Sequence, residues 1–203
     1  SIFTVMQSVL RLPVYYVIVM SWLTCCYMME IFIATVIDYV IDKGASQSDA
    51  VSVMSYSSLA DLLGRALLPL LADCNVLRRS TLTACNFFVM GAAVTCMPVA
   101  ASYGAIVAVT FAASCSGGCA MCMCGVLLAD NVGLDQLEIS YGLMGMIVAP
   151  LFLVRPLFVG FFRDKLGTYD DMYHVLAGLI FFTSLLWCLV ACTEQRTSKR
   201  YVL

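Results

Sequence analysis

The chain has 203 residues, of which 62% are hydrophobic and only 12% are charged, and its net charge at pH 7 is −2. Soluble domains contain about 45–50% apolar and about 25% charged residues, so this chain is too apolar for a single core in water. The small net charge, without basic clusters that alternate with aromatic residues, gives no basis for a nucleic-acid partner. The composition therefore predicts an all-α integral membrane protein.

Six segments are long and apolar enough to cross a hydrocarbon layer, which takes roughly 20 residues per helix. In chain order they cover residues 13–41, 50–73, 80–101, 103–129, 138–162 and 172–193. Residues 1–12 are the expected lead-in and residues 194–203 the expected tail. The pattern predicts a bundle of six transmembrane helices, with a tight hairpin near residues 101–104. Because the chain starts at Ser1 and soon becomes apolar, we expect it to be a piece of a longer protein.

The distribution of basic residues predicts the orientation of this bundle. If both ends of the chain are cytoplasmic, six of the 11 Lys and Arg residues lie inside, three lie outside and two lie within the spans. Basic residues favour the cytoplasmic side of membrane proteins. We therefore expect both ends in the cytoplasm, and we expect the plasma membrane as the location.

Two opposite charges lie within the second segment, in the stretch "SSLADLLGRALLPLLAD". Asp61 and Arg65 are four residues apart, so they share one face of a helix and can pair. A charged residue at the bilayer centre costs about 2.5–3.5 kcal/mol on insertion scales, and such residues usually face a polar path. One interpretation is mutual neutralisation only. The other is a site where Arg65 binds a carboxylate and the released Asp61 takes up a proton.

A second buried cation, Arg155, lies in the fifth segment before Pro156. Two interpretations remain open for it: a further contact to a substrate anion, or an ion pair with Glu30 or Asp38 of the first segment. Glu30 is expected in the middle of its span and Asp38 near the outer end. The single histidine, His174, is expected at the membrane interface.

The stretch "CSGGCAMCMCG" at residues 115–125 raises the question of a metal site. Zinc sites usually draw cysteine pairs from polar loops, whereas these four cysteines lie on several faces of one apolar span. Buried cysteine acts as a small hydrophobe, and Gly117 and Gly118 allow close approach of another helix. We therefore expect helix packing here, with no metal and no cofactor.

The segment "YSSLADLLGRALLPLLADCNVLRR", residues 56–79, resembles the eighth helix and following loop of the monocarboxylate transporter family. Its Asp-x-x-x-Arg pair and basic loop match that family. Residues 126–178, "VLLADNVGLDQLEISYGLMGMIVAPLFLVRPLFVGFFRDKLGTYDDMYHVLAG", are similar to the family's tenth helix through the start of its twelfth, including Asp130 and Asp164. The resemblance covers nearly the whole chain in order.

This resemblance implies the carboxyl-terminal six-helix half of a major facilitator superfamily fold. It implies alternating access, with Asp61 in proton coupling and Arg65 holding the substrate carboxylate. We expect Asp73, Arg78, Arg79 and Asp164 to act in gating. The implied partners are an amino-terminal six-helix half, a small organic anion, protons, the lipid membrane and a single-span ancillary protein.

Two positions depart from the family pattern and leave a second interpretation open. Arg155-Pro156-Leu157 stands where the family usually has Gly-Pro-Pro, and Pro69 stands where it usually has Gly. The departures favour a membrane receptor, a scaffold or a degenerate transporter that moves no substrate. No ring of repeated polar residues indicates a channel, and no nucleophile–base set indicates an enzyme.

Overall fold

The computed structural model describes residues 2–74 and 76–200, and this part of the chain is helical without any strand. Ser1 and residues 201–203 of the expected lead-in and tail lie outside the described residues. The helices are α1 (Ile2–Leu10), α2 (Pro13–Asp42), α3 (Gln47–Leu67), α4 (Leu70–Asp73), α5 (Arg79–Cys96), α6 (Tyr103–Val132), α7 (Leu137–Phe161) and α8 (Asp170–Arg200). A 3₁₀ turn, η1 (Leu134–Gln136), precedes α7, and a π turn, η2 (Phe162–Leu166), follows it.

Four helical segments of the described chain are long and apolar enough to cross a membrane. They run over Pro13–Asp42, Tyr103–Val132, Leu134–Leu166 and Asp170–Arg196. Helices α3 and α5 cover the other two predicted spans but do not reach this level of length and hydropathy. Helix α3 carries five serines and three charged residues, and α5 has only 18 residues. The described residues are thus all-helical and include four candidate membrane-spanning helices, and the count of six spans stays a prediction.

The predicted second span, 50–73, is divided in the structure. Helix α3 ends at Leu67, and Pro69 is the N-terminal cap residue of the short helix α4, which begins at Leu70. Proline has no backbone N–H to continue the hydrogen-bond ladder and clashes with the preceding turn, which explains the break.

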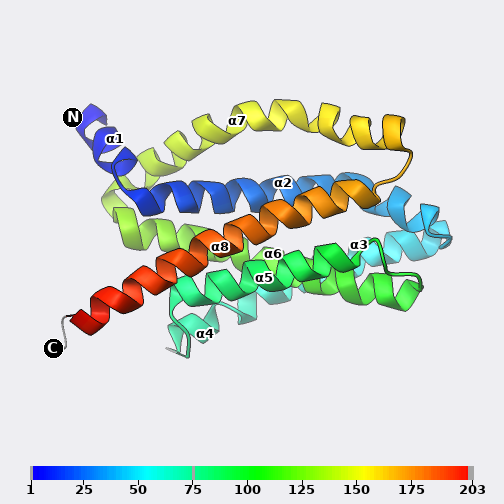
Figure 1. Cartoon of the computed structure of the whole chain (residues 1–203), viewed down its shortest axis with the longest axis horizontal. Coiled ribbons are helices and arrows are strands. Elements are labelled where there is room, and N and C mark those ends of the chain that lie inside the picture. The colour runs from blue at the N-terminus through cyan, green and yellow to red at the C-terminus, as the bar shows by residue number, and fades with distance from the viewer. Residues whose placement is uncertain (1, 75, 201–203) are drawn as a thin grey trace.

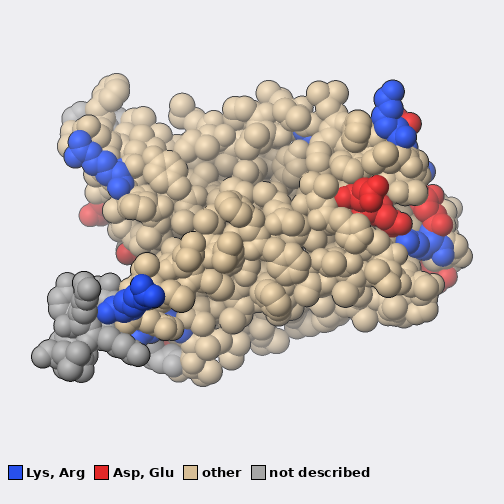
Figure 2. Space-filling view, in the orientation of Figure 1, with Lys and Arg blue, Asp and Glu red and all other residues tan. Residues whose placement is uncertain are grey.

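The long helices run alternately in opposite directions along the bundle, so α1 and the end of α8 lie at the same end (Figure 1). Helix α3 packs along α6, and α5 packs along both α6 and α8. Charged side chains gather at the two ends of the face seen in Figure 2, with a wide uncharged belt between them. This distribution suits a bundle whose middle lies in hydrocarbon.

Polar side chains link α2 and α8 inside the bundle. The indole N–H of Trp187 donates to the Ser21 hydroxyl over 2.6 Å, and the hydroxyls of Thr24 and Thr183 lie 2.9 Å apart. All four side chains are buried. Such hydrogen bonds hold helices together where the surrounding lipid is as apolar as the protein.

Candidate functional site

A cavity of about 290 Å³ lies between α2, α3 and α6, and it contains the two charges singled out in the sequence. Its wall combines apolar side chains of α2 with the polar face of α3 and one serine of α6. The lining residues are Met29, Phe32, Ile33, Met54, Ser57, Ser58, Asp61, Arg65 and Ser114. Small-molecule sites are usually concave and lined by apolar side chains, with a few polar groups that orient the ligand.

Asp61 and Arg65 form a forked ion pair within this cavity. Nε of Arg65 donates to Oδ2 of Asp61 over 2.7 Å, and Nη2 donates to Oδ1 over 3.2 Å. The Arg65 side chain is 41% exposed and the Asp61 side chain 21%. A guanidinium has five N–H donors, so the remaining donors of Arg65 are available to a second anion. The pair predicted from the spacing is therefore present, and its arginine is open to a ligand.

Two glycines bring α3 and α6 into backbone contact beside this pair. A Cβ atom on Gly118 would overlap the carbonyl oxygen of Asp61 and lie 2.9 Å from its Oδ1 atom. A Cβ atom on Gly64 would overlap the carbonyl oxygen of Cys115. The part of the cysteine-rich stretch that faces α3 thus serves close helix packing.

All 11 cysteines are free in the structure. Over the described residues, no three His, Cys, Asp or Glu side chains lie close enough together to hold a metal ion. Four of the cysteines, including Cys119 and Cys124, lie on the helix that carries Gly118, and these two are buried.

Arg155 of α7 forms an ion pair with Glu30 of α2. Both groups are partly accessible, with 31% and 48% of their side chains exposed. Glu30 follows directly after Met29, which lines the cavity. Of the two acidic partners considered for Arg155, the structure selects Glu30; Asp38 instead acts electrostatically on Arg163.

An ion network lies where α4, α5 and α6 meet. Arg79 pairs with Asp130 at the end of α6, and its Nη2 atom lies 3.6 Å from Oδ1 of Asp73. The hydrogen bond that Arg79 donates to Asp130 is the main reason why the pKa of Arg79 is raised. Of the predicted gating residues, Asp73 and Arg79 meet here, whereas Arg78 serves as the N-terminal cap residue of α5 through its backbone.

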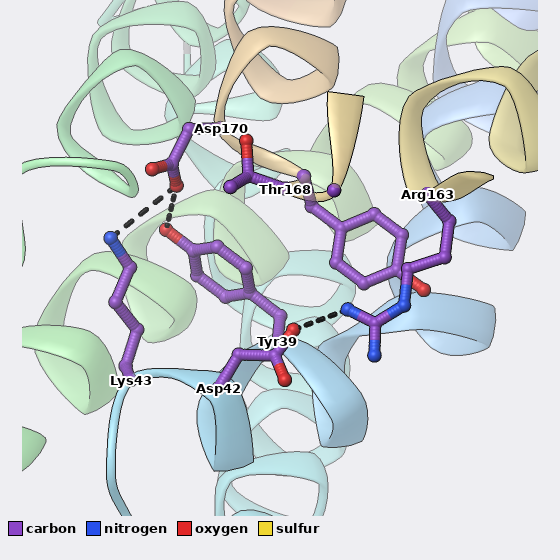
Figure 3. Close-up of a pocket in the computed structure, with 8 residues that line it drawn as sticks. Tyr39, Asp42, Lys43, Arg163, Thr168 and Asp170 are labelled. Atoms are coloured by element: carbon purple, nitrogen blue, oxygen red, sulfur yellow. Dashed lines mark hydrogen bonds and ion pairs between the residues drawn. The ribbon is translucent and has the colours of Figure 1, made fainter. Parts of the chain in front are cut away.

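A second polar cluster, at the opposite end of the bundle, surrounds a cavity of about 420 Å³ (Figure 3). Lys43 lies 3.3 Å from Asp170, and the Tyr39 hydroxyl lies 3.1 Å from the same carboxylate and 2.9 Å from the carbonyl oxygen of Met97. These contacts join α2, the α5–α6 connection and α8. The sequence did not predict these contacts, because each residue taken alone is an ordinary polar residue near the end of a helix.

An ion pair closes the other side of this cluster. Arg163 of η2 lies 2.5 Å from Asp42 at the end of α2 (Figure 3). Its guanidinium also lies over the ring of Tyr169, 5.1 Å from the ring centroid. The predicted gating residue Asp164 lies next to Arg163 in η2 but is not among the residues that line the cavity.

Asp130 and Asp42 are functional candidates that sequence reasoning did not select. Each lies near the end of a long helix and pairs with an arginine of another helix or turn. The available signal was the alternation of acids and arginines at the ends of the predicted spans, which is too common to single out a pair.

Comparison with known proteins supports the resemblance inferred from the sequence. No protein-family model matches the chain. The chain is 23% identical to monocarboxylate transporter 12 of Rattus norvegicus over 191 residues, which is 92% of this chain and 39% of that protein. It is 27% identical to monocarboxylate transporter 10 of Danio rerio over 57% of this chain and 23% of that protein.

Over a shorter stretch of 95 residues, which is 46% of this chain, the chain is 30% identical to monocarboxylate transporter 10 of Homo sapiens. The chain therefore spans well under half the length of the curated relatives it matches. The predicted resemblance to monocarboxylate transporters is confirmed at low identity. Their names describe transporters, the class predicted here in place of an enzyme.

Proposed function

We propose that the chain is the carboxyl-terminal six-helix half of a major facilitator superfamily transporter that carries a small organic monocarboxylate. The observation that carries the proposal is the Asp61–Arg65 fork inside a cavity of about 290 Å³. The names of the relatives supply the class of substrate, and the cavity supplies a cation matched to it.

Substrate binding is proposed to work by exchange of carboxylates at Arg65. An incoming carboxylate has the same charge and planar geometry as the Asp61 side chain, so it can compete with Asp61 for the guanidinium. Once Asp61 loses its partner, its charged form is less favoured and it takes up a proton. This exchange couples one proton to one anion. Arg155 is a second contact for the anion, reached when Glu30 releases it.

Alternating access is proposed to occur between this half and an amino-terminal six-helix half, around a site near mid-membrane. The network of Arg79, Asp73 and Asp130 closes the cytoplasmic end, with Arg78 beside it and both chain ends on that side. Asp164 belongs to the outer gate, next to the Arg163–Asp42 pair. The plasma membrane is the proposed location.

The exposed face of α7 is the proposed surface for contact with lipid and with partner proteins in the membrane. Met146, Leu153 and Leu157 of this helix are each more than 70% exposed. Exposed apolar side chains of this size need lipid or protein cover. Lipid, the amino-terminal half and a single-span ancillary protein are the partners that we propose.

Binding of pentanoate, a plain monocarboxylate, tests the proposed site. The chain is placed in lipid nanodiscs and titrated calorimetrically, together with Arg65→Gln and with Arg11→Gln as a control outside the cavity. We expect binding that is lost in Arg65→Gln and kept in Arg11→Gln. Absence of binding to the unchanged chain, or equal binding by all three proteins, would contradict the proposal.

A membrane receptor or scaffold without transport is the alternative function. The observations that favour it are the Arg155–Glu30 pair, which fills a place the family usually gives to glycine, and the break of the helix at Pro69. Counterflow assays on cells that express the full gene product distinguish a transporter from a receptor. A transporter exchanges labelled pentanoate in counterflow, whereas a receptor binds it without exchange.

A further inference from the structure

One hydroxyl group in the substrate cavity has no partner. Among the buried side-chain nitrogen and oxygen atoms of the described residues, Oγ of Ser57 is the one that makes no hydrogen bond. Ser57 as a residue is 5% exposed. A buried polar group without a partner is costly and rare in folded proteins, so it needs a physical explanation.

Three other serines of α3 show what an ordinary serine does on this helix. Ser52, Ser55 and Ser58 each donate to the carbonyl oxygen four residues earlier, at distances of 2.9, 3.4 and 3.0 Å. A hydroxyl that bonds back to its own helix is satisfied and needs no ligand. Ser57 stands apart because it does not make this bond, although it lies next to Ser58 on the same cavity wall.

The distance between Ser57 and the Asp61–Arg65 ion pair follows from their positions on α3. Ser57 lies four residues before Asp61 on the same face of α3, and both residues line the cavity. Four residues of an α-helix advance about 6 Å along the axis. Apolar side chains of α2 and α3, among them Phe32 and Met54, complete the wall. The Arg65 guanidinium reaches back to Asp61, with Nε 2.7 Å from Oδ2, so the cavity offers a cation, an apolar surface and, about one helical turn from the ion pair, a hydroxyl.

We propose that Ser57 is a substrate-binding residue whose hydroxyl bonds a second polar group of the transported anion. The ligand class is then an organic monocarboxylate with an apolar body and a hydroxyl or carbonyl group about 6 Å from its carboxylate, one helical turn along the site. This inference rests on the proposed function, because it takes Arg65 as the carboxylate contact.

Two probes that differ by one hydroxyl test the inference. An extended chain of four methylene groups covers the required separation, so 5-hydroxypentanoate is compared with pentanoate. Both are titrated against the chain in nanodiscs, and against Ser57→Ala and Ser58→Ala. Ser58→Ala is the matched control, because its hydroxyl lines the same cavity but is already bound to Met54.

The unchanged chain and Ser58→Ala should bind 5-hydroxypentanoate about three- to tenfold more tightly than pentanoate, which is the usual worth of one hydrogen bond. Ser57→Ala should lose this preference and keep its affinity for pentanoate. If pentanoate binds but all three proteins treat both probes alike, the role of Ser57 is wrong and the carboxylate site stands. If neither probe binds to any of them, the proposed function fails as well.

The stability of Ser57→Ala without ligand separates a binding role from a structural one. Removal of an unpaired buried hydroxyl takes away a desolvation cost, so the melting temperature of Ser57→Ala should equal or exceed that of the unchanged chain. A clear fall in melting temperature would show that the hydroxyl supports the fold, and would overturn the inference.

Discussion

Gly118 of α6 lies against the backbone of Asp61, so closely that a methyl group on it would overlap the Asp61 carbonyl oxygen. The same methyl group would lie 2.9 Å from the carboxylate oxygen Oδ1. The position of the acid that pairs with Arg65 is therefore set by a helix that carries no charge in this region. Asp61 can occupy this position because residue 118 has no side chain.

Gly118→Ala should destabilise the bundle by about 1–3 kcal/mol, the usual cost of forcing an extra methyl group into a packed interior. Since the obstacle is backbone, α3 and α6 must move apart as whole helices, and pentanoate affinity should fall with stability. Thermal unfolding in detergent and calorimetric titration measure the two effects. Gly104→Ala, on the same helix with open space around it, is the control and should lower neither stability nor affinity.

The arrangement along a single helix was predictable, and the arrangement between helices was not. The four-residue spacing of Asp61 and Arg65 fixes their common face, and the structure shows the pair. The choice between Glu30 and Asp38 for Arg155 depends on how α2 and α7 are rotated and shifted against each other. No local pattern encodes that register, because many rotations bury a similar amount of apolar surface in lipid.

The unpartnered hydroxyl of Ser57 was beyond sequence reasoning for a related cause. Ser57 and Ser58 are neighbours in a serine-rich helix, and nothing in their order distinguishes the bonded hydroxyl from the free one. The difference accompanies the burial of each side chain, because Ser57 is buried between helices and Ser58 is exposed. The break after α3, in contrast, follows directly from Pro69, although an unbroken span was expected there.

Glu30→Gln tests whether Arg155 is a second contact for the anion. The substitution removes the charge that holds Arg155, so the guanidinium is released from its pair and becomes available to an anion. Pentanoate should then bind about tenfold or more tightly, since a hydrogen bond to a charged group is worth about 1.5–3 kcal/mol. Calorimetric titration in nanodiscs is the measurement. An unchanged affinity would assign Arg155 to its pair with Glu30 alone.

Asp130→Asn should change the rate of transport and leave substrate affinity nearly intact. Asp130 lies far from the cavity and pairs with Arg79, so its loss weakens one side of the network that also holds Asp73. Counterflow of labelled pentanoate should change about two- to tenfold in rate, which corresponds to about 0.4–1.4 kcal/mol in the barrier.

Asp135→Asn is the matched control for that variant, because Asp135 is an exposed acid in the turn just after α6. Its counterflow should equal that of the unchanged protein. Equal rates for both variants would remove the Arg79 network from the gate. Asp73→Asn should act in the same direction as Asp130→Asn but more weakly, since Asp73 is 3.6 Å from Arg79.

Tyr39→Phe should lower stability by about 1–2 kcal/mol, because it removes the hydroxyl that lies near both the Met97 carbonyl and Asp170. The ring is buried and packs against Tyr173 at 5.0 Å, and phenylalanine keeps that contact. Thermal unfolding in detergent is the measurement. Tyr16→Phe, which removes an exposed hydroxyl bonded to Leu10, should cost clearly less.

Asp61→Asn tests proton coupling directly. In a one-to-one symport, one pH unit across the membrane supports about tenfold accumulation, because it is worth about 1.4 kcal/mol per proton. Asparagine keeps the shape of the side chain and can still accept a hydrogen bond from Arg65, but it carries no titrating proton. Uptake of pentanoate into cells should then continue down its gradient without response to pH.

Asp49→Asn, which changes an exposed acid at the start of the same helix, is the control and should leave the pH response intact. A normal pH response in Asp61→Asn would mean that the proton travels by another group, and would leave Asp61 as the partner of Arg65 only.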